Sequence, residues 1–156
     1  MRTIERACVA LLFVVLSACS GGSAPTAAQP APPPAELVEG DLRIIATIVP
    51  TTALQERVTR GYGIARGEDT WMLLVTVRRG PEGKDTSVPA KVDASARDLQ
   101  GRRIGIPMHA LTTADGLVDS VGTFAFTGPD TLQFNVLVTP QGETTRTLDF
   151  ARDIPK

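Results

Sequence analysis

Few side chains in this sequence could perform acid–base or metal chemistry. His109 is the only histidine, and no nucleophile motif such as G-x-S-x-G accompanies it. It falls at an outward position of a predicted strand, which indicates a solvated surface residue rather than a general base. Asp115 and Asp119 flank Gly116, but the D-x-D-x-D-G spacing of a calcium loop is absent. We therefore predict no enzyme, no metal site and no bound cofactor.

Cysteine chemistry is confined to the start of the chain. Cys19 closes the run Leu16-Ser17-Ala18-Cys19, behind a basic start and an apolar segment of about ten residues that is too short to span a bilayer. This arrangement resembles the lipobox of bacterial lipoproteins, in which the cysteine sulfur receives a diacylglycerol and the chain is cut before the cysteine. The resemblance implies a cleaved signal peptide over residues 1–18 and lipidation of Cys19 with palmitate-type chains.

The residues after Cys19 suit a tethered protein. Several acyl chains hold a protein stably at a membrane, whereas one chain attaches reversibly. Ser20 stands where an Asp commonly signals retention in the inner membrane, so the resemblance points to the outer membrane, facing the periplasm. Residues 19–36 are rich in Pro and Ala and carry no charge before Glu36, which predicts a disordered spacer. A ligand for a proline-binding groove is the alternative reading of this linker.

Residues 37–156 are long enough for one domain with one hydrophobic core. The whole chain has 16 basic and 17 acidic residues and a formal net charge of −1. This balance argues against a nucleic-acid partner. No cysteine follows Cys19, so the domain must be stabilised by packing rather than by disulfide bonds or thiolate metal sites.

The domain shows short blocks of alternating apolar and polar residues, separated by Gly, Pro and Asp, which predict an all-β fold. A helical segment over 53–60, capped by Thr51 or Thr52 and ended by Gly61 or Gly63, follows the first strand. Pro107 predicts an edge strand because proline donates no ladder hydrogen bond. The seven predicted strands cover 42–49, 71–78, 88–97, 104–109, 117–126, 132–138 and 145–151. Their number and spacing predict an antiparallel immunoglobulin-like β-sandwich, with a small barrel as the alternative.

Several sequence blocks also resemble a known family. They are Tyr62-Gly63-Ile64 with Arg66, Leu74-Val75-Thr76-Val77, Val88-Pro89-Ala90-Lys91-Val92, Asp98-Leu99-Gln100-Gly101, and Leu132-Gln133-Phe134-Asn135-Val136 before Pro140. In this order they resemble the uncharacterised bacterial periplasmic domain-of-unknown-function family 4426. The resemblance covers most of residues 37–150 and implies a sandwich with no known activity. Members of that family carry plain export signals, so the lipobox and the spacer are departures that leave location and partners open.

Three residues form the candidate recognition surface. Tyr62 and Arg66 follow the predicted helix in a loop, where a ring and a guanidinium could contact a partner, and His109 faces outward on the predicted edge strand. In the structural alternative, Tyr62 is a ring at the edge of the core, and Arg66 forms a local surface ion pair with Glu68 and Asp69. We predict a lipid-anchored periplasmic β-sandwich that binds another protein of the cell envelope. The alternative is a small-ligand carrier with a cavity between the sheets.

Overall fold

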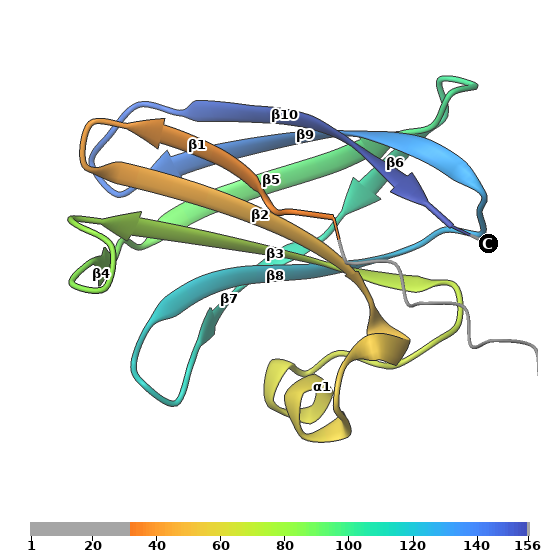
Figure 1. Cartoon of the computed structure of the whole chain (residues 1–156), viewed down its shortest axis with the longest axis horizontal. Coiled ribbons are helices and arrows are strands. Elements are labelled where there is room, and N and C mark those ends of the chain that lie inside the picture. The colour runs from red at the N-terminus through yellow and green to blue at the C-terminus, as the bar shows by residue number, and fades with distance from the viewer. Residues whose placement is uncertain (1–31, 156) are drawn as a thin grey trace, which may run out of the picture. The chain divides into compact units, whose positions relative to one another are not determined.

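The computed structural model of the protein describes residues 32–155. The predicted signal peptide, Cys19 and most of the predicted linker lie outside these residues. Within them, two antiparallel sheets pack face to face (Figure 1), which confirms the predicted all-β sandwich.

The six-stranded sheet contains the longest unbroken path of paired strands. Its order is β1-β2-β3-β8-β7, with the short β4 paired to β3. The bounds are β1 Ala35–Glu39, β2 Leu42–Pro50, β3 Thr70–Arg79, β4 Thr86–Ser87, β7 Met108–Thr112 and β8 Val118–Ala125. The four-stranded sheet has the order β10-β9-β5-β6. Its bounds are β5 Ala90–Arg97, β6 Arg103–Ile106, β9 Asp130–Pro140 and β10 Arg146–Ile154.

The core lies between the sheets and follows the period of two that the sequence shows. β3 contributes Trp71, Leu73 and Val75, and β9 contributes Leu132, Phe134, Val136 and Val138, all of them buried. The Phe134 ring lies edge-on to Phe124 and stacked on Phe150, with ring centroids 5.7 and 5.0 Å apart. β3 lies between β2 and β8 and is therefore the central strand of its sheet.

Residues 32–155 form ten strands where the sequence predicted about seven. β1 begins at Ala35, two residues inside the segment predicted as linker, and it pairs with β2 from Ala35 to Glu39. β4 is two residues long and was not predicted. The single strand predicted over 104–109 is two strands, β6 and β7, on either side of Pro107.

Pro107 marks a corner where the chain passes from one sheet to the other. β6 is an edge of the four-stranded sheet and β7 is an edge of the six-stranded sheet, so the predicted edge is confirmed on both sides. The corner packs tightly on β8, because a Cβ atom at Gly122 would lie 2.6 Å from the Pro107 carbonyl oxygen and 2.6 Å from Met108 Sδ. Glycine at position 122 is what allows this close approach.

The segment between β2 and β3 is helical, as predicted, but it is built differently. A short 3₁₀ helix, η1, covers Thr51–Ala53, and α1 covers Glu56–Tyr62. Thr51 does not cap α1; its hydroxyl is buried and exchanges hydrogen bonds with the backbone of Gly67. The helix ends at Tyr62 and is capped by Gly63, which has φ of 65° and donates its N–H to the Arg60 carbonyl oxygen.

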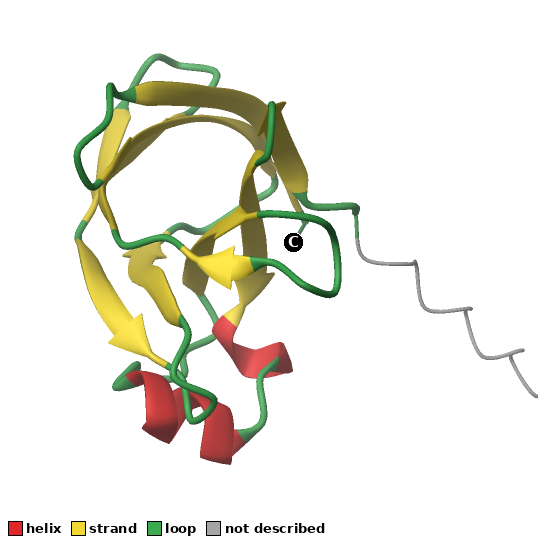
Figure 2. Cartoon of the chain, turned by 90° about the vertical axis from the view of Figure 1, so that its left-hand side faces the viewer, coloured by secondary structure: helices red, strands yellow, loops and turns green. Residues whose placement is uncertain are grey.

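Both helical segments lie beside the six-stranded sheet, on the side away from the four-stranded sheet (Figures 1 and 2). Among the described residues, no helix has the length and apolar character needed to cross a membrane.

Candidate functional site

The structure distributes the three predicted recognition residues over two elements and a loop. Tyr62 is the last residue of α1 and is half-buried, whereas His109 is exposed on the edge strand β7. Arg66 is exposed, and its Nη2 donates to the Thr52 carbonyl oxygen at 2.6 Å. The guanidinium of Arg66 therefore ties its loop to η1, and the predicted ion pair with Glu68 and Asp69 is not formed.

His109 and α1 border the same surface, which we call the outer face of the six-stranded sheet. The strand register aligns His109, Val121, Leu74 and Thr47 across β7, β8, β3 and β2. Met72 lies in the neighbouring row. These side chains point away from the space between the sheets, because they alternate with the core residues of their strands.

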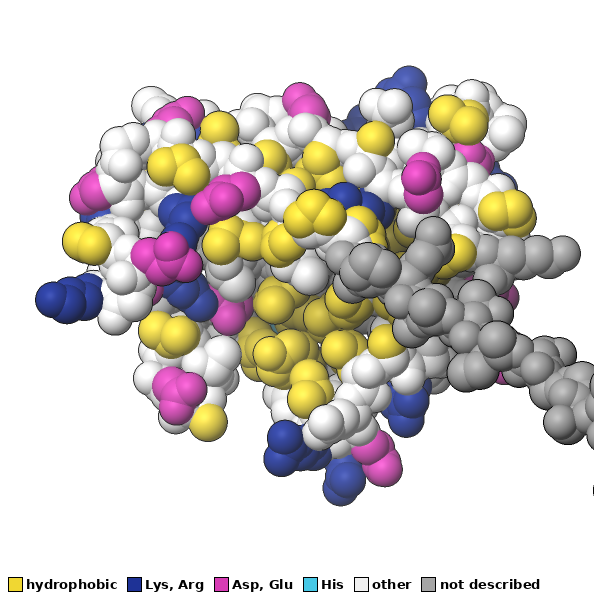
Figure 3. Space-filling view, viewed as in Figure 1, with side chains coloured by type: hydrophobic (Ala, Val, Ile, Leu, Met, Phe, Trp, Pro, Cys, Tyr) yellow, Lys and Arg dark blue, Asp and Glu magenta, His cyan; other side chains and the backbone are white. Residues whose placement is uncertain are grey.

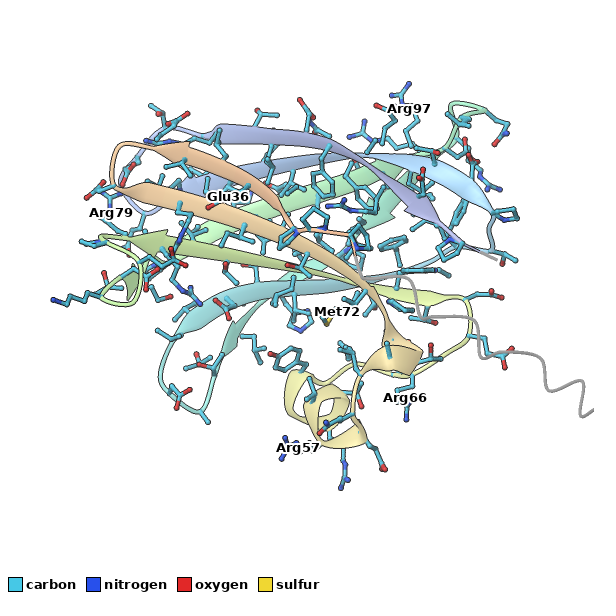
Figure 4. All side chains as sticks on the ribbon, viewed as in Figure 1. Glu36, Arg57, Arg66, Met72, Arg79 and Arg97 are labelled. Atoms are coloured by element: carbon cyan, nitrogen blue, oxygen red, sulfur yellow. The ribbon has the colours of Figure 1, made fainter. Side chains whose placement is uncertain are left out.

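This outer face is unusually apolar and well covered for a sheet surface on the solvent side. Val121 is 0% exposed and Met72 is 3% exposed, yet neither belongs to the core cluster between the sheets. Leu74, Ile45 and Val49 are half-buried on the same face. Figure 3 shows hydrophobic side chains gathered in a hollow between α1 and the β7–β8 hairpin, and Figure 4 shows Met72 on this side. We call this hollow the apolar groove.

A buried ion pair stands at the end of this face away from α1. Arg78 Nη2 lies 2.6 Å from Asp119 Oδ1, and the two side chains are 12% and 8% exposed. The Ser87 hydroxyl donates to the Val118 carbonyl oxygen and accepts from the Val118 N–H. Asp119 thus belongs to β8, within the strand predicted over 117–126, and to an ion pair. Among residues 32–155, no cluster of three potential metal ligands occurs.

A second ion pair lies next to the first. Arg43 Nη2 contacts Asp85 Oδ2 at 2.6 Å, and Arg43 is directly opposite Arg78 in the β2–β3 register. The hydrogen bond from Arg43 to Asp85 raises the pKa of the guanidinium, with the nearby carboxylates acting in the same direction against the effect of burial. Each arginine at this end of the face therefore has its own carboxylate.

The outer face of the four-stranded sheet is polar instead. A groove of about 410 Å³ on it is lined by Ser95, Arg97, Arg103, Gln133, Asn135 and Asp149, together with Ala96 and Phe134. A separate cleft of about 430 Å³ lies where β6 and the end of β8 meet, lined by Arg102, Ile104, Ala125, Phe126 and Thr127. Each is an open surface feature at an edge of the fold.

Comparison with known proteins agrees with this architecture. The family described as a domain of unknown function, DUF4426, matches residues 37–154. The chain belongs to the DUF4426 family. The resemblance noted in the sequence is thereby confirmed, and the matched residues run from β1 to the last residue of β10.

One solved structure of the family is similar to this DUF4426 domain. It is the crystal structure of a DUF4426 family protein from Pseudomonas aeruginosa PAO1, with 26% sequence identity and a TM-score of 0.67. The match covers 78% of this chain and 94% of the other chain. No curated protein matches the chain.

Sequence reasoning missed the apolar groove as a site. Met72 and Leu74 give the strand predicted over 71–78 an apolar second face. The signal that could have revealed the groove is the coincidence of this second apolar face with Ile45 and Val49 on β2 and Val121 on β8.

Proposed function

We propose that this protein is a lipid-anchored β-sandwich of the bacterial periplasm, held at the outer membrane through Cys19, that binds another envelope protein through the apolar groove. The single observation that carries the binding role is the apolar outer face of the six-stranded sheet. One face of an antiparallel sheet can be solvated and is then polar. A solvent-side face that gathers apolar side chains in a hollow is instead typical of an interaction site.

The charges around the apolar groove indicate what kind of segment it would bind. Arg78 and Arg43 are each neutralised by a carboxylate of this chain. A bound segment would therefore need no charge of its own at this end, and it would gain most from apolar side chains placed against Leu74, which is only half-buried. We propose that the partner contributes an uncharged, apolar segment rather than an acidic or basic one.

Binding without catalysis is the role that the side chains support. His109 makes no side-chain hydrogen bond to another described residue and lies exposed on β7. A general base needs a nucleophile within hydrogen-bond reach and a third group that orients it. The Ser87 hydroxyl is engaged by the backbone of Val118 instead. We therefore propose a binding protein with no cofactor, and not an enzyme.

The test is site-specific photocrosslinking in the intact cell. A photoreactive residue replaces His109 at the rim of the apolar groove or, as a control, Lys91, an exposed residue of β5 on the outer face of the four-stranded sheet. We expect one covalent adduct of defined size from position 109 and none from position 91. The adduct should disappear with Leu74→Ser and persist with Leu137→Ser, a matched leucine on the other outer face that is 36% exposed.

Anchoring is tested in the same assay. With Cys19→Ala, the lipid is lost, and we expect the adduct from position 109 to weaken because the domain is no longer held beside its partner. Equal adducts from both faces, or an adduct unchanged by Leu74→Ser in a protein whose melting temperature is preserved, would refute the groove as the binding surface.

The small-ligand carrier remains the alternative function. Such a carrier needs free space between the sheets, whereas Phe134, Leu132 and Leu73 fill the centre of the sandwich with side chains that are 2% exposed or less. The cleft near Arg102 and Phe126 is the place where a ligand would enter. A small apolar ligand that raises the melting temperature, together with no adduct from either crosslinking position, would favour the carrier.

A further inference from the structure

The groove on the outer face of the four-stranded sheet contains two arginines that lie directly opposite each other. This placement does not stabilise the fold. Arg97 ends β5 and Arg103 begins β6, and the two residues are directly opposite each other in the antiparallel register. Both are exposed. Like charges placed directly opposite on neighbouring strands destabilise a sheet.

Several other arginines of the domain are neutralised by a carboxylate. Arg43, Arg78, Arg79 and Arg146 each contact a carboxylate from a distant part of the chain. Among residues 32–155, neither Arg97 nor Arg103 forms an ion pair. Arg103 donates only to the Ser95 hydroxyl, at 3.2 Å. The two guanidinium groups thus keep most of their donors available.

The turn between the two strands is built so that it holds the pair in place. Asp98 is 4% exposed, and its carboxylate accepts hydrogen bonds from the Arg102 backbone N–H at 2.7 Å and from Arg102 Nε at 2.9 Å. The Gly101 N–H donates to the Asp98 carbonyl oxygen at 3.0 Å. Arg102 thus engages the Asp98 carboxylate, which leaves Arg97 and Arg103 without it.

Further polar groups lie beside the arginines on the next strands. Gln133 is directly opposite Arg97, and Asn135 is directly opposite Ser95. Asp149 lies one strand further, opposite Asn135, and its Oδ1 accepts a hydrogen bond from Asn135 Nδ2 at 2.7 Å. Donors therefore gather at the β5–β6 end of the groove, and a carboxylate acceptor stands at the β10 end.

We propose that this groove binds an acidic segment of a peptide chain, with a carboxylate held by Arg97 and Arg103. The two guanidinium groups and the one carboxylate give the groove lining a single net positive charge, which suits a monoanion. Guanidinium groups recognise carboxylates through paired hydrogen bonds. Asp149 and Asn135 then accept from peptide N–H groups further along the segment. Figure 4 shows Arg97 on the side of the molecule opposite Met72, so this site is separate from the apolar groove.

The test is a titration of the purified chain, followed by NMR, with an N-acetylated and C-amidated Ala-Glu-Ala peptide. We expect saturable shifts in the backbone amide signals of β5, β6 and β9. Arg97→Gln and Arg103→Gln should each weaken binding about tenfold, because each substitution removes a charge-assisted hydrogen bond to the peptide carboxylate. Arg97→Lys should fall between wild type and Arg97→Gln, because it keeps the charge and loses the paired geometry.

Matched controls make the result decisive. Arg57→Gln removes an exposed arginine on α1, far from the groove (Figure 4), and should leave binding unchanged. An Ala-Gln-Ala peptide should not bind. Equal binding of the two peptides, or an equal effect of Arg57→Gln, would overturn the site. Tighter binding of dimethyl phosphate than of the Glu peptide would overturn the peptide assignment in favour of a phosphodiester ligand.

Discussion

The two outer faces of this sandwich differ in a way that the two inner faces do not. Both inner faces are apolar and meet in one core. The outer face of the four-stranded sheet carries exposed or half-buried polar side chains, such as Lys91, Ser95 and Gln133. The outer face of the six-stranded sheet buries Met72 and Val121 almost completely. One sheet therefore has a single buried face, and the other has two.

This difference shows that the alternation of side chains along a strand does not by itself determine which of them are buried. In the six-stranded sheet, α1 and the β7–β8 hairpin rise on either side of the outer face and shelter side chains that strand geometry alone would expose (Figure 3). Leu74 on the same face is only half-buried. A docking surface combines buried side chains at its floor with apolar side chains that a partner can still reach.

The largest expected effect concerns the buried ion pair on the outer face of the six-stranded sheet. Asp119→Ala should lower the free energy of unfolding by about 3 kcal/mol, because Arg78 is left nearly buried without its carboxylate. Urea denaturation measures this change. Asp115→Ala, in the exposed hairpin turn, should change stability by less than about 0.5 kcal/mol. Equal effects of the two substitutions would mean that the face is not sheltered in solution.

A direct comparison of the two outer faces comes from one apolar residue on each. Met72→Ala should cost about 2 kcal/mol, because Met72 is 3% exposed and its removal leaves a cavity under α1. Leu137→Ala on the four-stranded sheet should cost less than about 0.5 kcal/mol, since Leu137 is already 36% exposed. Thermal unfolding of both variants measures the difference. Similar losses of stability in the two variants would mean that the two outer faces do not differ in burial.

The corner that joins the sheets predicts a further loss of stability. Gly122→Ala should cost about 2 kcal/mol, because the added Cβ atom would collide with the Pro107 carbonyl oxygen and Met108. Gly105→Ala is the matched control, since a Cβ atom there meets nothing within 4 Å. Circular dichroism melts of the two variants should separate them clearly. A neutral Gly122→Ala would show that the corner is looser than its contacts indicate.

The smallest effect has the opposite sign and belongs to the polar outer face. Arg97→Gln should raise the free energy of unfolding by about 0.3 kcal/mol at low salt, because it relieves the like-charge contact with Arg103. The gain should fade as added salt screens the charges. Urea denaturation at two salt concentrations measures it, with Arg57→Gln as the control. A loss of stability instead would show that Arg97 supports the fold and is not kept for a ligand.

Much of the fold was predictable because its signals are local. Alternation in β3, β5 and β9 identified the strands and their inward side chains, and Pro107 correctly identified an edge. β1 was missed because Ala35 and Glu36 directly follow a proline-rich run and were read as part of the spacer. β1 forms nevertheless because it pairs with the edge of β2. The sequence of β1 itself does not show that this edge is available for pairing.

The candidate sites were less predictable, because they depend on residues far apart in the chain. Arg78 and Asp119 are separated by 41 positions, and no local pattern pairs them. Arg97 and Arg103 could each be placed on an outward position from the sequence, but only the register of the β5–β6 hairpin puts them directly opposite each other. Tyr62 and Arg66 lie close in sequence, yet the fold gives Arg66 a local structural contact with Thr52.

The sequence by itself determined the class of the fold, most turn positions, the inward half of the predicted strands and the prediction of lipidation at Cys19, since each rests on neighbouring residues. The tertiary structure decided which outward residues are sheltered, which charges are neutralised and which remain available. The physical reason is that period and turn chemistry act within a few residues, whereas burial and ion pairing depend on strand register and on how α1 and the β7–β8 hairpin lie over the sheet.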